Sequence, residues 1–266
     1  MIATQEADRQ IDILGVNIDD VTTARGIEII EEMITHPEST PRSIYFVNAH
    51  TLNFAHAEPE YAALLNRGDR VFGDGTGVRW GARLQGIQIR DNLCGTDFIP
   101  SLFTLTPNKG YSYFLLGADS ETIESAADYA RRMFPGWHQV GHHHGFLKDA
   151  TTREQAINHI NVCQPDIVLV GMGNPLQEKW IEEYKDQLET KVCLGIGGLY
   201  DYWADNVSRA PLWIRRAGYE WVWRIIQQPR DKFMRYFIGN PRYLMNIYRE
   251  HRGRKRTKPQ QETSHV

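Results

Sequence analysis

Short, continuously apolar runs alternate along the chain with longer stretches whose apolar residues recur every three or four positions. The first pattern predicts strands and the second predicts amphipathic helices. Strands are expected at 11–18, 43–47, 70–72, 111–117, 138–141, 166–171 and 191–198, and helices at 24–34, 51–65, 78–84, 120–133, 152–163 and 175–188. This alternation indicates an α/β fold, with a largely parallel sheet of Rossmann-like βα units and helices on both faces.

The pattern changes after position 208, where aromatic and aliphatic residues at helical spacing are interleaved with arginines and lysines. Between 209 and 258 stand 14 Lys/Arg and 3 Asp/Glu, against 16 and 29 in residues 1–208. A basic end on an acidic body suggests an anionic partner, which could be a membrane surface, a nucleic acid or a phosphate-bearing substrate. The alternative is a helical cap that packs on the body.

Three segments follow from this division. Residues 1–208 are predicted to form the α/β core, and 209–251 a basic helical appendage that associates with membranes. Residues 252–266 are polar and are expected to be a disordered tail.

Composition supports a globular protein, since 41% of residues are apolar and 24% are charged. The three cysteines are too few for a disulfide scaffold, and we expect all three to be buried thiols in a reducing compartment. The sequence has neither a signal-peptide pattern nor an apolar stretch long enough to cross a bilayer. These features predict a soluble, cytoplasmic protein.

Four polar or glycine-rich loops follow predicted strands, at 47–51, 73–77, 171–178 and 195–201. In open α/β sheets the ligand binds beyond the carboxyl ends of the strands, which is where these loops would meet. Asp74 lies between two glycines, and a carboxylate there could act as a general base. The alternative is an aspartate that only caps the following helix.

The two later loops are suited to a phosphorylated ligand. Gly171, Gly173 and Asn174 precede a predicted helix, whose first N–H groups can bind phosphate. Gln177 would lie in the first turn, where it could contact a sugar or phosphate or simply cap the helix. Asp201 could accept a hydrogen bond from a uracil ring or a ribose hydroxyl, or could be a solvated loop residue. The loop lacks the third glycine of the dinucleotide motif and the lysine of a P-loop.

A metal site is not expected. The histidines at 142–144 are adjacent on a predicted strand, so their side chains would point alternately to opposite faces. No cysteine or acidic residue stands nearby at the spacing of a metal site.

Eight blocks together resemble the WecG/TagA/CpsF family of bacterial glycosyltransferases. They span about residues 10 to 250 and read Val47-Asn-Ala-His-Thr-Leu-Asn53, Gly73-Asp-Gly-Thr-Gly-Val-Arg-Trp80, Gly95-Thr-Asp97, His144-Gly-Phe146, Gly171-Met-Gly-Asn-Pro-Leu-Gln-Glu178, Gly195-Ile-Gly-Gly-Leu-Tyr-Asp201, Arg209-Ala-Pro211 and Glu220-Trp-Val-Trp-Arg224 leading to Arg235-Tyr236.

The resemblance implies a metal-independent, inverting enzyme that uses a UDP-sugar, a polyprenyl-diphosphate-linked sugar acceptor and no cofactor. It implies peripheral attachment to the inner face of the cytoplasmic membrane. Donors in the family include UDP-N-acetylmannosamine, its uronate and UDP-glucose. The implied base is Asp74. Substrate-binding residues are expected at Asn48, His50, Thr76, Arg90, Asn92, Gln177, Arg215, Arg216 and Arg224, and nucleotide-binding residues at Phe146, Gly171, Gly173, Asn174, Gly197, Gly198, Tyr200 and Asp201.

One position departs from the family pattern, because Asn92 stands where many relatives have an arginine. Arg90 could serve instead, and a donor other than N-acetylmannosamine becomes more plausible. Two other functions stay open from the residues alone. One is an α/β nucleotide-binding oxidoreductase, disfavoured by the missing dinucleotide motif, and the other is a nucleic-acid-binding module that uses the basic end. No nucleic-acid partner is expected, and a homo-oligomer is left open.

Overall fold

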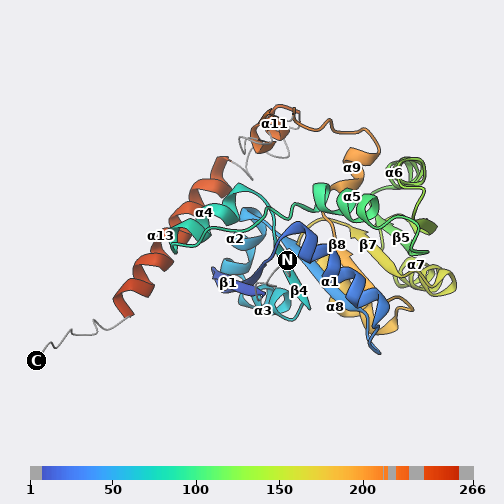
Figure 1. Ribbon diagram of the computed structural model, residues 1–266, viewed down its shortest axis with the longest axis horizontal. Coiled ribbons are helices and arrows are strands. Elements are labelled where there is room, and N and C mark those ends of the chain that lie inside the picture. Colours follow the sequence, from blue (N-terminus) through green and yellow to red (C-terminus); the bar gives the residue numbers. More distant parts are fainter. Residues whose placement is uncertain (1–7, 212, 215–219, 228–236, 258–266) are drawn as a thin grey trace, which may run out of the picture.

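The fold is built on one eight-stranded sheet with the strand order β1-β2-β4-β3-β8-β7-β5-β6. Figure 1 shows β8, β7 and β5 side by side within it. The computed structural model describes residues 8–211, 213–214, 220–227 and 237–257. All neighbouring strands are parallel except β1 and β2. The strands are β1 (Arg9–Ile13), β2 (Val16–Asp20), β3 (Arg42–Val47), β4 (Arg70–Gly73), β5 (Ser112–Gly117), β6 (His138–His143), β7 (Ile167–Gly171) and β8 (Val192–Gly195). The predicted largely parallel α/β sheet is thus confirmed.

Helices cover both faces of the sheet. On strand β3, Ile44 and Phe46 point to one face, whereas Tyr45 and Val47 point to the other. The first face is covered by α1 (Thr23–Thr35), α5 (Gly95–Leu105), α6 (Ser120–Met133) and α9 (Leu199–Trp203). The second is covered by α2 (Ala49–Ala57), α3 (Pro59–Asn66), α4 (Thr76–Leu84), α7 (Ala150–Cys163), α8 (Leu176–Tyr184) and α13 (Gly239–Thr257). Helix α11 spans Glu220–Gln227.

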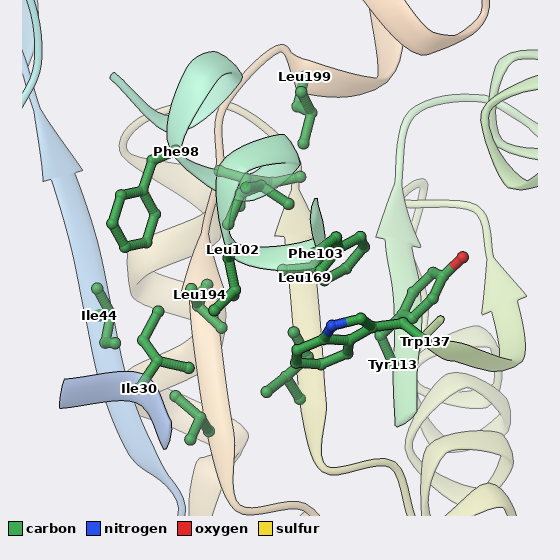
Figure 2. Packing of buried hydrophobic residues seen from close by; sticks show 14 of the residues in the cluster. Ile30, Ile44, Phe98, Leu102, Phe103, Tyr113, Trp137, Leu169, Leu194 and Leu199 are labelled. Carbon is green, nitrogen blue, oxygen red and sulfur yellow. The ribbon is translucent and has the colours of Figure 1, made fainter. Parts of the chain in front are cut away.

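Helix α5 was not predicted, yet it is central to the core of the first face. Figure 2 shows Phe98, Leu102 and Phe103 of this helix directed at the apolar side chains of the strands. Phe103 also stacks on Trp137, with ring centroids 4.6 Å apart. All four side chains are buried, so α5 closes this face of the sheet beside the 91–95 loop.

The predicted strand at 11–18 is wrong, because the chain turns within it. Leu14 and Gly15 have φ values of 55° and 82°, and they form the tight turn between the antiparallel strands β1 and β2. A leucine in the left-handed region is unusual, and its apolar side chain, which is buried, concealed the turn. The hairpin places one antiparallel strand at the edge of the sheet.

Two predicted helices also end earlier than expected. The helix at 51–65 is divided into α2 and α3 at Glu58, which precedes Pro59. Proline disfavours a helical conformation in the residue before it, so the first helix ends there. The helix expected to reach 188 ends at Tyr184 and continues as a 3₁₀ turn, Lys185–Gln187.

The last helix packs on the α/β body, unlike a separate appendage. Tyr243 and Ile247 of α13 are buried in the core of the second face, and α13 lies beside α2 and α4 (Figure 1). Asn53 of α2 donates to the carbonyl of Gly239 at 2.7 Å. Helix α13 extends to Thr257, so residues 252–257 are helical, in contrast to the predicted tail, while 258–266 lie outside the described residues.

The three cysteines do not share the burial expected of them. Of the three cysteines only Cys193 is fully buried, whereas Cys94 and Cys163 keep partial exposure. Within the described ranges, no helix has the length and apolarity needed to cross a membrane.

Candidate active site

A cavity of about 450 Å³ lies at the carboxyl ends of the central strands. The four loops predicted to meet at this edge all line it, after β3, β4, β7 and β8. Because these strands are parallel neighbours in the middle of the sheet, their carboxyl ends converge at one edge. The predicted residues in its wall are Asn48, His50, Asp74, Thr76, Asn92, Gly171, Gly173, Asn174, Gln177, Gly197, Gly198, Tyr200 and Asp201.

Asp74 is held in this wall by its backbone. It follows β4 directly, and its N–H donates to the carbonyl of Val47 at 2.7 Å. The next residue, Gly75, has φ +89°, a conformation that favours glycine. The side-chain oxygen of Asn92 accepts the Gly75 N–H at 2.6 Å. Asn92 therefore fixes the turn that presents Asp74 to the cavity.

Asn48 follows the neighbouring strand β3 and caps helix α2. Its Oδ1 accepts from the backbone N–H groups of His50 (3.0 Å) and Thr51 (3.2 Å), at the start of α2. Helix α4 begins beside it, since a Cβ added to Gly77 would lie 2.7 Å from the Ala49 side chain. The first turns of the two helices are consequently packed together behind Asp74.

A thiol also lines the cavity. The Sγ of Cys94 lies 3.0 Å from the Thr96 hydroxyl. Burial raises the pKa of this thiol well above its usual value, and the charge of Asp74 raises it further. Cys94 therefore stays protonated at neutral pH, which makes it a poor nucleophile.

Gln177 joins the two loops of the opposite wall. Its side chain is buried, and its Oε1 accepts from the backbone N–H groups of Gly173 (3.2 Å) and Gly197 (2.9 Å). These bonds resemble the capping alternative more than a free substrate-binding amide. A direct contact between Gln177 and a substrate stays a prediction.

Tyr200 forms part of the cavity floor. It is buried, and its hydroxyl donates to the carbonyl of Leu169 at 2.6 Å. A Cβ added to Gly171 would lie 2.6 Å from the Tyr200 ring, so this position requires glycine. Asp201 follows Tyr200 in α9 and also borders the cavity.

Five predicted residues are not placed in the wall. Arg90 is outside it and donates its backbone N–H to Asp20 at 2.8 Å. Phe146 is 56% exposed and also lies outside the wall. Arg215 and Arg216 fall outside the described residues, and only the backbone of Arg224 is described, in α11.

The cavity also contains residues that the sequence analysis did not select. Trp80, Met172, Trp221, Asn240 and Tyr243 all contribute to its wall. Trp80, Met172 and Trp221 belong to the motif blocks, which could have identified them. Tyr243 belongs to the aromatic and basic stretch after position 208, but that pattern placed neither it nor Asn240 at the cavity. Both reach the cavity because α13 packs against α2 and α4.

Across the parts of the chain that the structure describes, no group of three or more His, Cys, Asp or Glu side chains is arranged to hold a metal ion. His142 and His143 lie on β6, the edge strand of the sheet. Metal independence stays a prediction.

The chain is similar in sequence to proteins of known activity. The family described as "Glycosyl transferase WecG/TagA/CpsF family" matches residues 11–257. Three proteins of Staphylococcus aureus, from strains NCTC 8325 / PS 47, COL and MRSA252, are each 29% identical to it over 217 residues. The match covers 82% of this chain and 84% of each relative, and each is named N-acetylglucosaminyldiphosphoundecaprenol N-acetyl-beta-D-mannosaminyltransferase.

Proposed function

Because this chain belongs to the WecG/TagA/CpsF family of glycosyl transferases, we propose that it moves a hexose from a UDP-sugar to a polyprenyl-diphosphate-linked sugar. The reaction proceeds with inversion at the anomeric carbon and needs no metal. It takes place at the inner face of the cytoplasmic membrane, to which the protein attaches peripherally.

The observation that carries the proposal is the position of Asp74. This carboxylate and the loops at 171–174 and 197–201 line one cavity at the carboxyl edge of the sheet. Asp74 accepts the proton of the acceptor hydroxyl as that oxygen attacks the anomeric carbon. The bond from the anomeric carbon to the UDP oxygen breaks in the same step, and the configuration inverts. A single carboxylate is sufficient for this chemistry.

The leaving UDP gains negative charge as this bond breaks. Without a metal, cationic side chains must stabilise that charge. Arg215, Arg216 and Arg224 are the candidates, because they precede or belong to α11, whose Trp221 borders the cavity.

The acceptor and donor are proposed from the relatives and from position 92. The relatives' name supports a diphosphate-linked lipid acceptor and N-acetylmannosamine as one candidate sugar. Glucose and the N-acetylmannosamine uronate are the others. The side-chain oxygen of Asn92 accepts a hydrogen bond from the Gly75 N–H. An arginine side chain has no acceptor atom, so it could not make this bond. The loop beside Asp74 is therefore held differently here than in relatives that have an arginine at this position.

A donor screen tests the proposal. UDP-glucose, UDP-N-acetylmannosamine and its uronate are each incubated with a polyprenyl-diphosphate-linked sugar and the full chain. One donor should give a lipid-linked product of inverted anomeric configuration, with and without EDTA. Absence of product from all of these nucleotide sugars, while the protein fails to bind UDP, would contradict the proposed donor class.

Family membership favours this function over the two alternatives left open by the sequence, an oxidoreductase and a nucleic-acid-binding module. UDP should raise the melting temperature, NAD should not, and oligonucleotides should bind weakly and without sequence preference.

A further inference from the structure

One buried carboxyl group beside the cavity has no part in the mechanism above. Glu178 lies in the first turn of α8 and is fully buried. Its Oε1 accepts from the side-chain amides of Asn174 (2.5 Å) and Gln177 (2.7 Å), and its Oε2 accepts from the Tyr61 hydroxyl (3.0 Å). Burying a carboxyl group is costly, and these three neutral donors offset part of that cost.

The carboxyl group determines which way the Gln177 amide faces. An amide nitrogen can only donate and an amide oxygen can only accept. Because the Gln177 nitrogen donates to Glu178, the Gln177 oxygen is directed at the N–H groups of Gly173 and Gly197. If the Gln177 amide were reversed, its NH₂ group would face the two glycine N–H groups, and neither N–H would have an acceptor.

The two glycines belong to the loops that end β7 and β8. Their φ values are +80° and +62°, and among the described residues only the flanking ones come within 4 Å of the place where a Cβ would stand. Glycine adopts such conformations readily but is also flexible, so its loop needs an external constraint. The Gln177 oxygen supplies that constraint to both loops at once. Asn174, the second amide held by Glu178, lines the cavity next to them.

We propose that Glu178 is a positioning residue for the nucleotide end of the cavity, where its carboxylate holds the amides of Asn174 and Gln177 in the orientation that ties the two glycine loops together. Glu178 touches no substrate and acts through these amides. The identity of the ligand, a uridine diphosphate, rests on the proposed function, whereas the tie between the loops does not.

Glu178→Leu is the direct test, because it keeps the approximate size of the side chain and leaves the amides of Asn174 and Gln177 without their shared acceptor. Two quantities are measured at pH 8: amide hydrogen exchange at Gly173 and Gly197 in the ligand-free protein, and UDP affinity by calorimetry. Both amides should exchange at least about tenfold faster and UDP affinity should fall about tenfold, as expected when buried donors lose an acceptor. Circular dichroism should stay unchanged.

Two variants serve as controls. Glu182 lies one turn further along α8, and its carboxylate contacts Tyr45, Arg67 and Lys185 outside the cavity. Glu182→Gln should leave UDP affinity and exchange at both glycines at the parent values. Tyr61→Phe removes one donor to Glu178 without reversing an amide, so its effect on UDP affinity should stay below about threefold.

Each outcome decides the proposal. Parent-like exchange at Gly173 and Gly197 in folded Glu178→Leu would overturn the tie, and faster exchange with parent-like UDP affinity would overturn its role in nucleotide binding. If the parent protein binds no UDP, the proposed function fails, while the exchange measurement still decides whether the loops are tied. Should Glu178→Leu not fold, Glu178→Asp, whose shorter carboxylate cannot reach both amides, is measured in the same way with the same expected directions.

Discussion

Several polar side chains that line this cavity also form hydrogen bonds to the backbone of the surrounding loops. The oxygens of Asn48, Asn92 and Gln177 each accept one or two backbone N–H groups at the edge of the sheet. Buried N–H groups need partners, and loops cannot pair them as strands do. The sequence predicted that these residues gather at one edge. It could not predict the bonds from Asn92 to Gly75 and from Gln177 to Gly197, because each joins two different loops. The Asn48 bonds, by contrast, form a local helix cap.

Asn92 gives the first prediction. Asn92→Ala removes the acceptor of the Gly75 N–H and loosens the turn that carries Asp74. We expect kcat to fall by about tenfold, since a hydrogen bond contributes roughly 1 kcal/mol and misplacement of the base adds to the loss. Steady-state kinetics measure it. Asn66→Ala is the matched control, because Asn66 also accepts a backbone N–H, from Asn17, but lies outside the cavity. Equal kcat values for Asn92→Ala and the parent would contradict the account.

Glu178 gives a prediction on the pH dependence of stability. Burial raises the pKa of Glu178 from its usual 4.5 to about 7, while Tyr61 and the two amides oppose the shift. Between these values the folded chain holds a proton that the unfolded chain has lost. The free energy of unfolding should therefore fall as pH rises from about 5 to about 7, by up to about 1.4 kcal/mol per pH unit, and level off above.

Urea denaturation of the parent and of Glu178→Gln at several pH values measures this contribution. The variant cannot titrate at this position, so the parent should lose stability relative to it across the window. A stability difference that is constant from pH 5 to pH 7 would show that Glu178 titrates normally.

At the scale of elements, periodic patterns predicted the parallel strands and most helices, and the failures have local causes. The N-cap residue of helix α5 is Cys94, which makes no side-chain capping bond, and the helix contains Pro100. Both features argue against a helix in isolation. The helix exists because Phe98, Leu102 and Phe103 are buried against the sheet, and tertiary burial outweighs weak local propensity.

Caps were predicted in the right places but on the wrong residues. Ser120 and Thr152 begin the helices predicted at 120–133 and 152–163, and the sequence predicts them as the caps of these helices. The structure instead places Asp119 and Asp149 at these positions, where they accept from Thr122 and Thr152. Asp, Ser and Thr are all good caps, so sequence alone does not decide between neighbours of these types.

The docking of α13 on α4 gives the third prediction. Tyr243 is buried, and its hydroxyl donates to the carbonyl of Gly77 at 2.9 Å, in the helix that follows Asp74. Tyr243→Phe should lower stability by about 1 kcal/mol, or a few degrees in Tm, and should also reduce kcat. Tyr248→Phe, at an exposed position of α13, should change neither. Calorimetry and kinetics measure the effects, and a Tyr243→Phe protein with parent Tm would refute the role of this bond.

At the scale of the whole molecule, charge and apolar exposure gather at the C-terminal end. Exposed apolar residues of this region are Trp213, Ile226, Phe237, Ile238, Leu244, Met245 and Tyr248. They stand in the segment that carries 14 Lys/Arg against 3 Asp/Glu, whereas the body is acidic. This combination suits an anionic lipid surface. Tyr243 is buried against the body, so a chain cut before Arg209 would expose the surfaces of α2 and α4 that α13 covers. Point variants are therefore a better test of membrane binding than truncation.

The fourth prediction concerns vesicles that contain anionic lipid. Binding should weaken with added salt, because each basic residue near the surface contributes about 1 kcal/mol and 0.1 M salt screens charges beyond roughly 10 Å. Met245→Glu with Tyr248→Glu should reduce the binding that remains in high salt. Leu105→Glu with Val162→Glu, at still more exposed positions of the body, should not. Co-sedimentation with the vesicles measures the binding of both double variants. An equal loss of binding in the two would argue against membrane contact through the exposed apolar residues of α13.

The central claim is that Asp74 accepts the acceptor proton in a sugar transfer, and single-turnover kinetics of Asp74→Asn test it most directly. The variant keeps the glycine turn and the Gly75–Asn92 bond, so it should fold and bind UDP within about threefold of the parent. The rate of transfer from UDP-sugar to lipid-linked acceptor should fall by about 10²–10⁴, the usual contribution of a general base. A folded Asp74→Asn protein that transfers sugar at the parent rate would contradict the account.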